Sequence, residues 1–156
     1  MERKIESRAE SDMKPSPARI HDLAGSLFTN MAEGLALHRV IMENGRAADY
    51  EFLDVNRAYE RIVGLSREEI VGKRGGGLFG SPVPYLSIYA RAALERDSTR
   101  FVAYYPKLGK HLDISVFSPA LGYFATILSD VTKHILAEQE QESLKQYLES
   151  VIDHAN

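Results

Sequence analysis

The sequence predicts an α+β domain in which helices cover one face of an antiparallel sheet. Strand patterns occur twice, within residues 34–55 and within residues 100–129, and helical patterns lie between them. Strands at both ends of a domain with helices in the middle are typical of this class. A polar helical pattern follows the last strand at once, after Asp130-Val131-Thr132. We therefore expect a sheet that continues directly into a protruding helix.

The first part of the chain predicts a lead-in and one helix. Residues 1–15 are charged and nearly free of large apolar side chains, so they are expected to be disordered. Ser16-Pro17 is typical of an N-cap followed by proline at the first helical position. Apolar residues then recur at three- and four-residue spacings, at Ile20, Leu23, Leu27 and Met31. We expect an amphipathic flanking helix within residues 16–31.

Two strands and two short helices are expected next. Residues 34–42 and 50–55 read as strands, and Asn44-Gly45 predicts a turn between them, at the loose tip of a hairpin. Asn56 is a suitable N-cap for a short helix over 57–63. A serine–glutamate capping box at Ser66 to Glu69 opens the second short helix.

Glycines gather before a longer helix. Gly75, Gly76, Gly77 and Gly80 predict a flexible loop. The lysine and hydroxyl residue that follow the glycines of a phosphate-binding loop are missing here. A hinge or lid over a pocket and a plain surface loop remain open. The longer helix, over 83–95, is expected to face the core through Leu86, Tyr89, Ala90 and Ala93.

The last third predicts three strands and a long helix. The strands are expected over 100–106, 110–118 and 122–129, and Asp130 can cap the helix that follows. From about Thr132 to His154 that helix would extend about 35 Å.

Apolar residues of this helix recur as in a coiled-coil seam, at Leu144, Tyr147 or Leu148, and Val151. His134, Ala137 and Gln141 continue the seam more weakly, which suits a marginal pairing helix. A single helix packed back on its own sheet is the alternative.

Composition excludes several classes of function. The net charge is −3 and no basic stripe appears, so nucleic acid is not an expected partner. No apolar run suits a membrane segment and no secretory signal begins the chain, which favours the cytoplasm. The chain has 0 cysteines, which excludes disulfides and thiolate metal sites. Its 5 histidines form no metal-ligand pair and are expected at strand edges or on solvated faces. No nucleophile-elbow motif joins serine, histidine and aspartate, and no metal site is expected.

Four local motifs resemble the PAS sensory domain family. They are Asp54 to Arg61 (DVNRAYER), Val63 to Lys73 (VGLSREEIVGK), Gly122 to Ala125 (GYFA) and Asp130 to Thr132 (DVT). The resemblance covers residues 27–155. It implies a five-stranded antiparallel sheet in the order 2-1-5-4-3, with short helices forming a pocket over one face.

The resemblance also implies roles for single residues. Asn56 matches the helix-capping asparagine of the family, and Asp130 and Thr132 match its terminal Asp-x-Thr motif. There, around Val131, movement of the sheet is passed to an output helix. Such domains precede histidine kinase or diguanylate cyclase modules in bacterial or archaeal multi-domain proteins, and they often dimerise through flanking helices. Residues 148–156 resemble the start of a following PAS domain, so a downstream domain in the same polypeptide is expected.

The cofactors known in this family can be compared with the residues present. The photoactive flavin and the thiol-linked chromophore need a cysteine, which the chain lacks. The haem type has a ligating histidine on the helix that corresponds to 83–95, and this segment contains none. His111 stays open as another axial ligand. The cofactor is therefore unknown.

Aromatic residues are the candidate pocket lining, because tyrosine offers a small organic ligand both an apolar face and a hydroxyl. The alternative is that these rings fill the core. The candidates are Tyr59, Phe79, Tyr85, Tyr89, Phe101 and Tyr105.

The predicted function is a non-catalytic sensory, signal-relay and dimerisation module. The expected division is a lead-in (1–15), a flanking helix (16–31), a PAS domain (32–131) and a signalling helix (132–156). A small cone-shaped α+β enzyme, with Asp54 or Asp113 as acid or base, is one alternative. A dimerisation adaptor without ligand is another. The ligand, the output domain and the dimer geometry are not determined by the sequence.

Overall fold

The computed structural model describes residues 16–155 of the 156-residue chain. Its centre is a five-stranded antiparallel sheet in the order β2-β1-β5-β4-β3. The predicted fold class and strand order are therefore confirmed. The strands are β1 (Gly34–Glu43), β2 (Arg46–Val55), β3 (Thr99–Tyr105), β4 (Lys110–Phe117) and β5 (Tyr123–Asp130).

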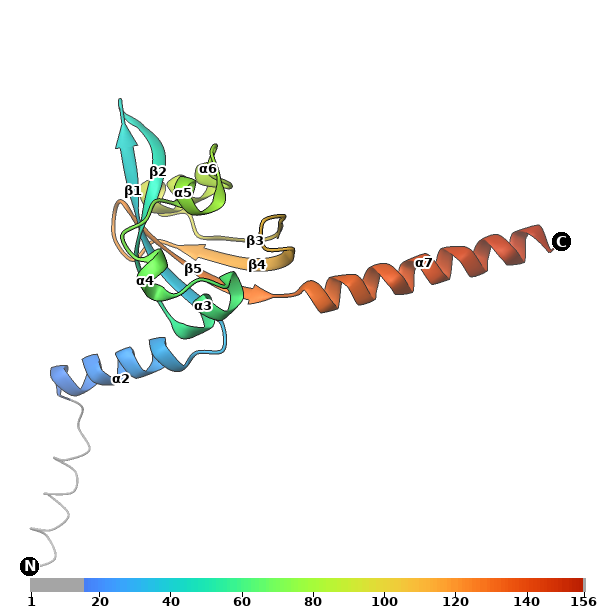
Figure 1. Ribbon diagram of the computed structural model, residues 1–156, viewed down its shortest axis with the longest axis horizontal. Helices are drawn as coiled ribbons and strands as arrows, with labels where there is room; N and C mark the ends of the chain where they lie inside the picture. The colour runs from blue at the N-terminus through green and yellow to red at the C-terminus, as the bar shows by residue number, and fades with distance from the viewer. Residues whose placement is uncertain (1–15, 156) are drawn as a thin grey trace, which may run out of the picture.

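Short helices cover one face of this sheet (Figure 1). Those packed most closely on it are α3, which contacts β1, and α6, which contacts β1, β2, β4 and β5. Alternate strand residues, such as Leu112, Ile114 and Val116 of β4, point into the core beneath them. The helices are α3 (Arg57–Val63), α4 (Arg67–Ile70), α5 (Gly75–Phe79) and α6 (Leu86–Glu95).

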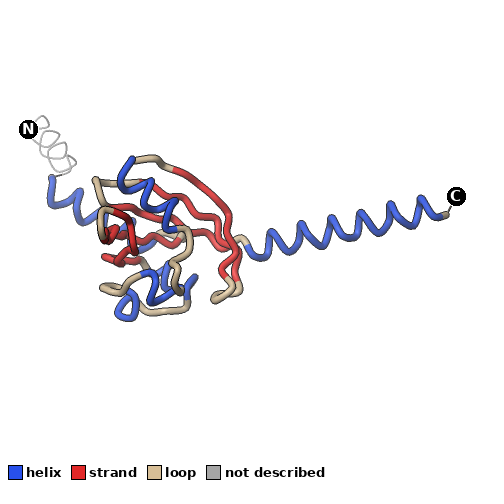
Figure 2. Tube along the Cα trace, turned by 90° about the horizontal axis from the view of Figure 1, so that it is seen from above, coloured by secondary structure: helices blue, strands red, loops and turns tan. Residues whose placement is uncertain are grey.

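Two further helices flank the domain. α2 (Pro17–Asn30) starts at Ser16, whose hydroxyl accepts a hydrogen bond from the Arg19 amide at 3.2 Å. α7 (Thr132–His154) extends away from the end of β5 (Figure 2). Neither helix contains a buried residue. The predicted lead-in, 1–15, lies outside the described residues. No helix within 16–155 combines the length and apolar character that a bilayer span requires.

The first hairpin is tighter than expected. The returning strand was predicted from residue 50, but β2 begins at Arg46, directly opposite Glu43. Asn44 and Gly45 have φ of 51° and 74°, so the turn consists of these two residues. Positive φ at both central positions matches the right-handed twist of a hairpin, which is why Asn-Gly closes it without a longer loop.

The glycine-rich segment is not the flexible loop that was predicted, because Gly75 to Gly77 open the helix α5. Gly75 is buried, and a Cβ atom on it would lie 2.3 Å from Cζ of Tyr50. The Gly76 amide donates a hydrogen bond to Oδ1 of Asp49 at 3.1 Å. The glycines therefore allow backbone to approach β2 closely.

The longer helix also starts later than predicted, at Leu86. It buries Tyr89, Ala92 and Ala93, whereas Ala90 was expected at the core and Ala92 was not. Tyr85 is the N-cap of α6, and its left-handed backbone conformation, with φ of 60°, prevents the helix from starting earlier.

Candidate functional site

A small cavity lies between the inner face of the sheet and the short helices. Its volume is about 10 Å³, which leaves room for about one water molecule. Four of the six predicted pocket residues line it, namely Tyr59, Phe79, Tyr89 and Tyr105. The other lining residues are His38, Tyr50, Val63, Leu108, Leu112, Thr126 and Leu128.

The remaining two candidates lie beside the cavity and do not line it. Tyr85 and Phe101 are half-buried, and their ring centroids are 5.0 Å apart. Tyr85 also contacts Tyr105, at 5.7 Å. The structure thus brings all six aromatic residues into one part of the core and divides them between the cavity wall and its support.

The cavity is small because closely packed aromatic rings fill most of the space around it. Phe124 stacks with His38 at 4.3 Å and with Tyr89 at 4.8 Å between ring centroids. The Tyr50 ring meets these three rings edge-on, with interplanar angles of 85° to 88°. Such edge-to-face and stacked pairs are favourable beyond the area they bury. A displacement of one ring would therefore disturb several others.

His38 corrects the expectation that the histidines are solvated. Its side chain is buried in β1, and burial lowers its pKa to about 3, although a hydrogen bond to the Phe124 carbonyl partly opposes this effect. Nδ1 lies 3.3 Å from that carbonyl oxygen. Since a carbonyl only accepts, Nδ1 carries the proton and Nε2 is an acceptor. Ala36, His38 and Val40 alternate on one face of β1, and this alternation could have predicted that His38 is buried.

The cavity wall carries polar atoms. The hydroxyls of Tyr89 and Tyr105 lie 3.1 Å apart and share a hydrogen bond. Within residues 16–155, the hydroxyls of Tyr59 and Thr126 and Nε2 of His38 have no partner in the protein. No fully enclosed side-chain nitrogen or oxygen in that range lacks a partner, so these atoms border the cavity. The wall therefore suits a water molecule or one small polar group.

The tyrosine hydroxyls of the wall stay protonated. Burial raises the pKa of Tyr59 and of Tyr89, and it raises the pKa of Tyr105 to about 12. Burial likewise raises the pKa of Tyr50. Each hydroxyl can therefore donate as well as accept a hydrogen bond at neutral pH.

Two lysines of the β3–β4 hairpin hold the short helices in place. Nζ of Lys107 donates to the Leu78 carbonyl of α5, and Nζ of Lys110 donates to the Ile62 carbonyl of α3, both at 2.6 Å. Carbonyls near the end of a helix lack backbone partners and attract cations. These bonds close the wall of the cavity between the hairpin and the helices.

Asn56 fastens the start of α3 to the start of β1. Its Oδ1 accepts from the amides of Leu35, at 2.8 Å, and Tyr59, at 3.0 Å. Its Nδ2 donates to the Glu33 carbonyl at 3.0 Å. The structure thus places Asn56 at the N-cap of α3, where it also orients the helix that carries Tyr59.

The junction between β5 and α7 is held by a chain of hydrogen bonds. Oδ1 of Asp130 accepts from the amide of Thr132, at 3.0 Å, and from its hydroxyl, at 2.5 Å. The same hydroxyl accepts from the amide of His111 in β4, at 3.0 Å. The Val131 amide donates to the His111 carbonyl, also at 3.0 Å. The N-cap of α7 is Val131, so Asp130, which was expected to cap the helix, lies one residue before the observed capping position.

Asp130 is ionised at this junction. Partial burial raises its pKa. Hydrogen bonds from Thr132 and the charges of Lys110 and His111 together lower the pKa by more than burial raises it, so the pKa is below its usual value. The carboxylate thus remains a strong acceptor for Thr132 near neutral pH.

The two carboxylates considered for catalysis do not line the cavity. Asp54 accepts from Nε of Arg67 at 2.8 Å, at the surface. Asp113 pairs with Arg100 at 2.5 Å, and this hydrogen bond lowers the pKa of the carboxyl group. His111 does not line the cavity either and packs on Tyr104, at 4.8 Å between ring centroids. Among residues 16–155, no group of three or more histidine, aspartate or glutamate side chains could hold a metal ion.

Comparison with known proteins identifies the fold. No protein-family model and no curated protein matches the chain. Among solved structures, a domain of a sensory box sensor histidine kinase/response regulator from Geobacter sulfurreducens is similar, at 18% identity and a TM-score of 0.56. This match covers 74% of the present chain and 97% of that one.

Two other solved structures are similar. The PAS domain of a protein from Colwellia psychrerythraea has 14% identity and a TM-score of 0.53, over 73% of this chain and 98% of that one. An RNA-binding Light-Oxygen-Voltage receptor has 16% identity and a TM-score of 0.60, over 88% of this chain and 42% of that one. At these identities the likeness concerns the fold. The chain has the PAS fold, as its local motifs predicted.

Proposed function

We propose that this chain is the sensory and signal-relay module of a larger signalling protein, of the histidine kinase or diguanylate cyclase type. A change of packing at the aromatic cavity is passed through β5 and Asp130-Val131-Thr132 to α7, which leads to an output domain in the same polypeptide. The module is a cytoplasmic homodimer, paired through its flanking helices, and has no catalytic role of its own.

The short path between the cavity wall and α7 carries this proposal. Leu112 lines the cavity. The backbone of its neighbour His111 donates to the Thr132 hydroxyl and accepts from the Val131 amide, at the start of α7. Leu128 lines the same cavity, two residues before Asp130. Leu112 and Asp130 are directly paired across β4 and β5. A shift of either cavity-lining leucine would therefore move the residues that hold the first turn of α7.

The size of the cavity and the residues of its wall limit which stimuli the module can sense. A cavity of about 10 Å³ suits a small polar molecule or a rearrangement of rings, and a larger ligand requires movement of α5 or α6. A cysteine-linked flavin or chromophore is not proposed, since the chain has no cysteine. Haem bound through residues 83–95 is not proposed either, since that segment has no histidine.

The relay can be tested by changing a cavity residue that lies outside β4, β5 and α7. Phe79 lies on α5, which packs on β2, two strands away from β5. We expect Phe79→Leu to change hydrogen exchange of the Ile135 amide, which is bonded to the Val131 carbonyl at 3.0 Å. Adding Thr132→Val should remove this dependence, because the substitution deletes the hydroxyl that joins β4 to α7.

A matched control is Phe117→Leu, since Phe117 lies at the other end of β4 and outside the cavity. It should leave exchange at Ile135 unchanged. If Phe79→Leu alters exchange in β4 and β5 but leaves Ile135 as in the parent chain, the relay is refuted.

A ligand-free dimerisation adaptor is the second candidate, and the small cavity is the observation that favours it. Native mass spectrometry of the purified chain separates the two. A small molecule retained by the parent chain and lost in Phe79→Leu supports sensing. A dimer without any bound molecule supports the adaptor, provided that Phe79→Leu also leaves hydrogen exchange of the Ile135 amide as in the parent chain.

A further inference from the structure

The two edges of the sheet differ in how they are protected from other strands. Strand β2 lies at one edge and β3 at the other (Figure 1). Residues 72–74 cover the middle of β2. The Gly72 amide donates to the Phe52 carbonyl at 2.8 Å, and the Phe52 amide donates to the Lys73 carbonyl at 3.0 Å. Charged side chains lie along β2 as well, and both features prevent pairing with a further strand.

Strand β3 has no such cover. Within residues 16–155, the backbone groups of 99–104 that face away from β4 make no hydrogen bond. The side chains of Val102 and Tyr104 are 55% and 50% exposed. Arg100 is the only charged residue of the strand, and no lysine, proline or bulge interrupts it. An edge of this kind is a template for pairing with another strand.

We propose that β3 pairs antiparallel with β3 of a second copy of the chain, so that the two sheets join edge to edge. The two-fold axis of this pair lies at Val102, which faces its own copy. The contact is distinct from the proposed pairing through flanking helices and adds a second interface. Because Lys107 and Lys110 of the β3–β4 hairpin hold the short helices, it also links the walls of two cavities.

The sequence of β3 is complementary to itself in this register. A pair centred on Val102 uses the whole strand and sets Arg100 against Tyr104 of the second copy, twice by symmetry. Opposite side chains of antiparallel strands are close enough for the guanidinium to contact the electron-rich face of the ring. No like charges are opposed. Moving the axis to Phe101 or Ala103 would separate the arginine from the tyrosine, so the register is defined.

The Arg100 side chain is already held on the open face of the sheet. Its Nε donates to Oδ1 of Asp113 in β4 at 2.8 Å, and its Nη2 lies 2.5 Å from Oδ2. This bidentate pair fixes the guanidinium, and 72% of the arginine side chain remains exposed. Tyr104 lies on the same face, where its ring packs on His111. Both groups of the proposed contact are therefore accessible to a second copy.

Disulfide trapping tests the axis, and the chain is suited to it because it has no cysteine of its own. Val102→Cys should give a covalent dimer on mild oxidation, since opposite residues of antiparallel strands have Cα atoms about 4.5–5.5 Å apart. Leu121→Cys is the collision control. It lies in the turn before β5 and is 67% exposed, yet it should cross-link less. Equal cross-linking of the two variants overturns the axis.

Packing of the open sheet faces is the other arrangement of two copies that trapping can detect. Tyr123→Cys reports it, because Tyr123 lies on the open face of β5 and is 38% exposed. If Tyr123→Cys cross-links and Val102→Cys does not, the edge contact is refuted.

Charge at the axis tests whether position 102 meets its own copy. Val102→Lys or Val102→Glu alone opposes like charges, and we expect the dissociation constant of the β3 pair to rise about tenfold. An equimolar mixture of the two variants opposes unlike charges and should recover the parent affinity. Because Val102 is exposed, both variants should unfold at the parent temperature. A mixture that stays as weak as its components overturns the self-pairing.

Hydrogen exchange reports the backbone bonds directly. Raising the concentration of the parent chain should protect every second amide of β3, namely those that face away from β4. The amides of β2 are the control and should gain no protection, because residues 72–74 already cover that edge. Exchange of β3 that does not depend on concentration refutes the backbone pairing.

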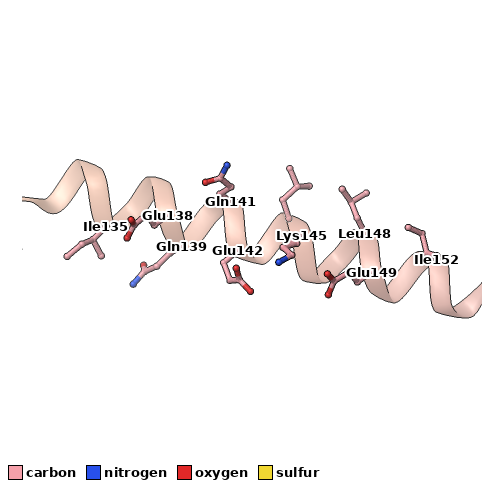
Figure 3. A pocket seen from close by; sticks show the side chains of 10 residues that line it. Ile135, Glu138, Gln139, Gln141, Glu142, Lys145, Leu148, Glu149 and Ile152 are labelled. Atoms are coloured by element: carbon pink, nitrogen blue, oxygen red, sulfur yellow. The ribbon is translucent and has the colours of Figure 1, made fainter.

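Helix α7 has exposed apolar side chains of its own, such as Leu148 and Ile152, which point out from the helix in Figure 3. Leu148→Glu therefore provides a background in which pairing through α7 is weakened. Sedimentation equilibrium in this background should still detect a dimer, and adding Val102→Lys should remove it.

The outcomes separate this inference from the proposed pairing through flanking helices. If Leu148→Glu is monomeric at every concentration while the parent chain is a dimer, the β3 contact is overturned and the helix pairing stands. A dimer that persists after both substitutions overturns the β3 contact as well. If Val102→Lys alone makes the parent chain monomeric, the β3 contact stands and the helix pairing is refuted. A parent chain that is monomeric at every concentration refutes both.

Discussion

The aromatic cavity and helix α7 differ in how much of their conformation is held by contacts. Rings around Phe124 contact one another from several strands and from α6, and the lining residues His38, Tyr59 and Tyr89 are each less than 5% exposed. α7 contains no buried residue. A close-packed region transmits a displacement because its side chains have little free volume. A helix that contacts the domain only near its first turn can follow such a displacement at little cost in free energy. The cavity region is therefore stiff, whereas α7 is compliant.

The same substitution in both regions should break this comparison most clearly. Leu112 lines the cavity and is 1% exposed, so Leu112→Ala should lower the free energy of unfolding by about 2–5 kcal/mol. Leu148 is 51% exposed on α7, so Leu148→Ala should change it by less than about 0.5 kcal/mol in dilute solution. Urea denaturation measures both. Equal losses would mean that α7 is part of the domain core.

Acid should destabilise the cavity region through His38. Its folded pKa is about 3, below the ordinary value of 6.5, because burial excludes the charged ring. Above pH 6.5 the histidine is neutral whether the chain is folded or unfolded. Below it only the unfolded chain takes up the proton, so stability falls by up to about 1.4 kcal/mol per pH unit until the folded pKa is reached.

His38→Asn keeps a donor near the Phe124 carbonyl and removes this titration, so its stability should depend less on pH between 6 and 4. His21→Asn on the exposed side of α2 is the matched control and should leave the dependence as it is in the parent chain. Denaturation curves at several pH values measure the slopes, and parallel slopes for the parent and His38→Asn would contradict the assignment.

The contact between α5 and β2 should be sensitive to a single methyl group. Gly75→Ala places a Cβ atom against the Tyr50 ring, which must move, at a cost of about 1–3 kcal/mol. Gly77 lies in the same helix with no atom within 4 Å of such a Cβ, so Gly77→Ala should be neutral or stabilise by up to about 1 kcal/mol. Thermal unfolding, together with the near-UV circular dichroism of the tyrosines, distinguishes them. Similar behaviour of both variants would show that α5 is loosely attached.

The junction should give the smallest effect. Thr132→Val keeps the shape of the side chain but removes the hydroxyl that donates to Asp130 and accepts from His111, at a cost of about 1–2 kcal/mol. Thr132→Ser keeps the hydroxyl and should lose much less. Because the folded pKa of Asp130 is lowered, its contribution is present near neutral pH and is lost as pH falls below about 4. Hydrogen exchange across residues 131–135 reports the change, and protection that is equal in the two variants would argue against the hydroxyl network.

Local signals in the sequence predicted much of this molecule. Alternating apolar residues placed β4, Asn56 marked the start of α3, and the change of pattern after Asp130 placed the start of α7. Each of these features depends on residues within a few positions of one another, through side-chain periodicity or capping bonds.

Only the tertiary structure decided how the site is assembled. The burial of His38 against Phe124, the approach of Gly75 to Tyr50 and the bond between His111 and Thr132 each join residues far apart in the chain. The volume of the cavity follows from the packing of rings contributed by several strands and helices. Close packing depends on where every neighbouring side chain lies, and local periodicity carries no information about that arrangement.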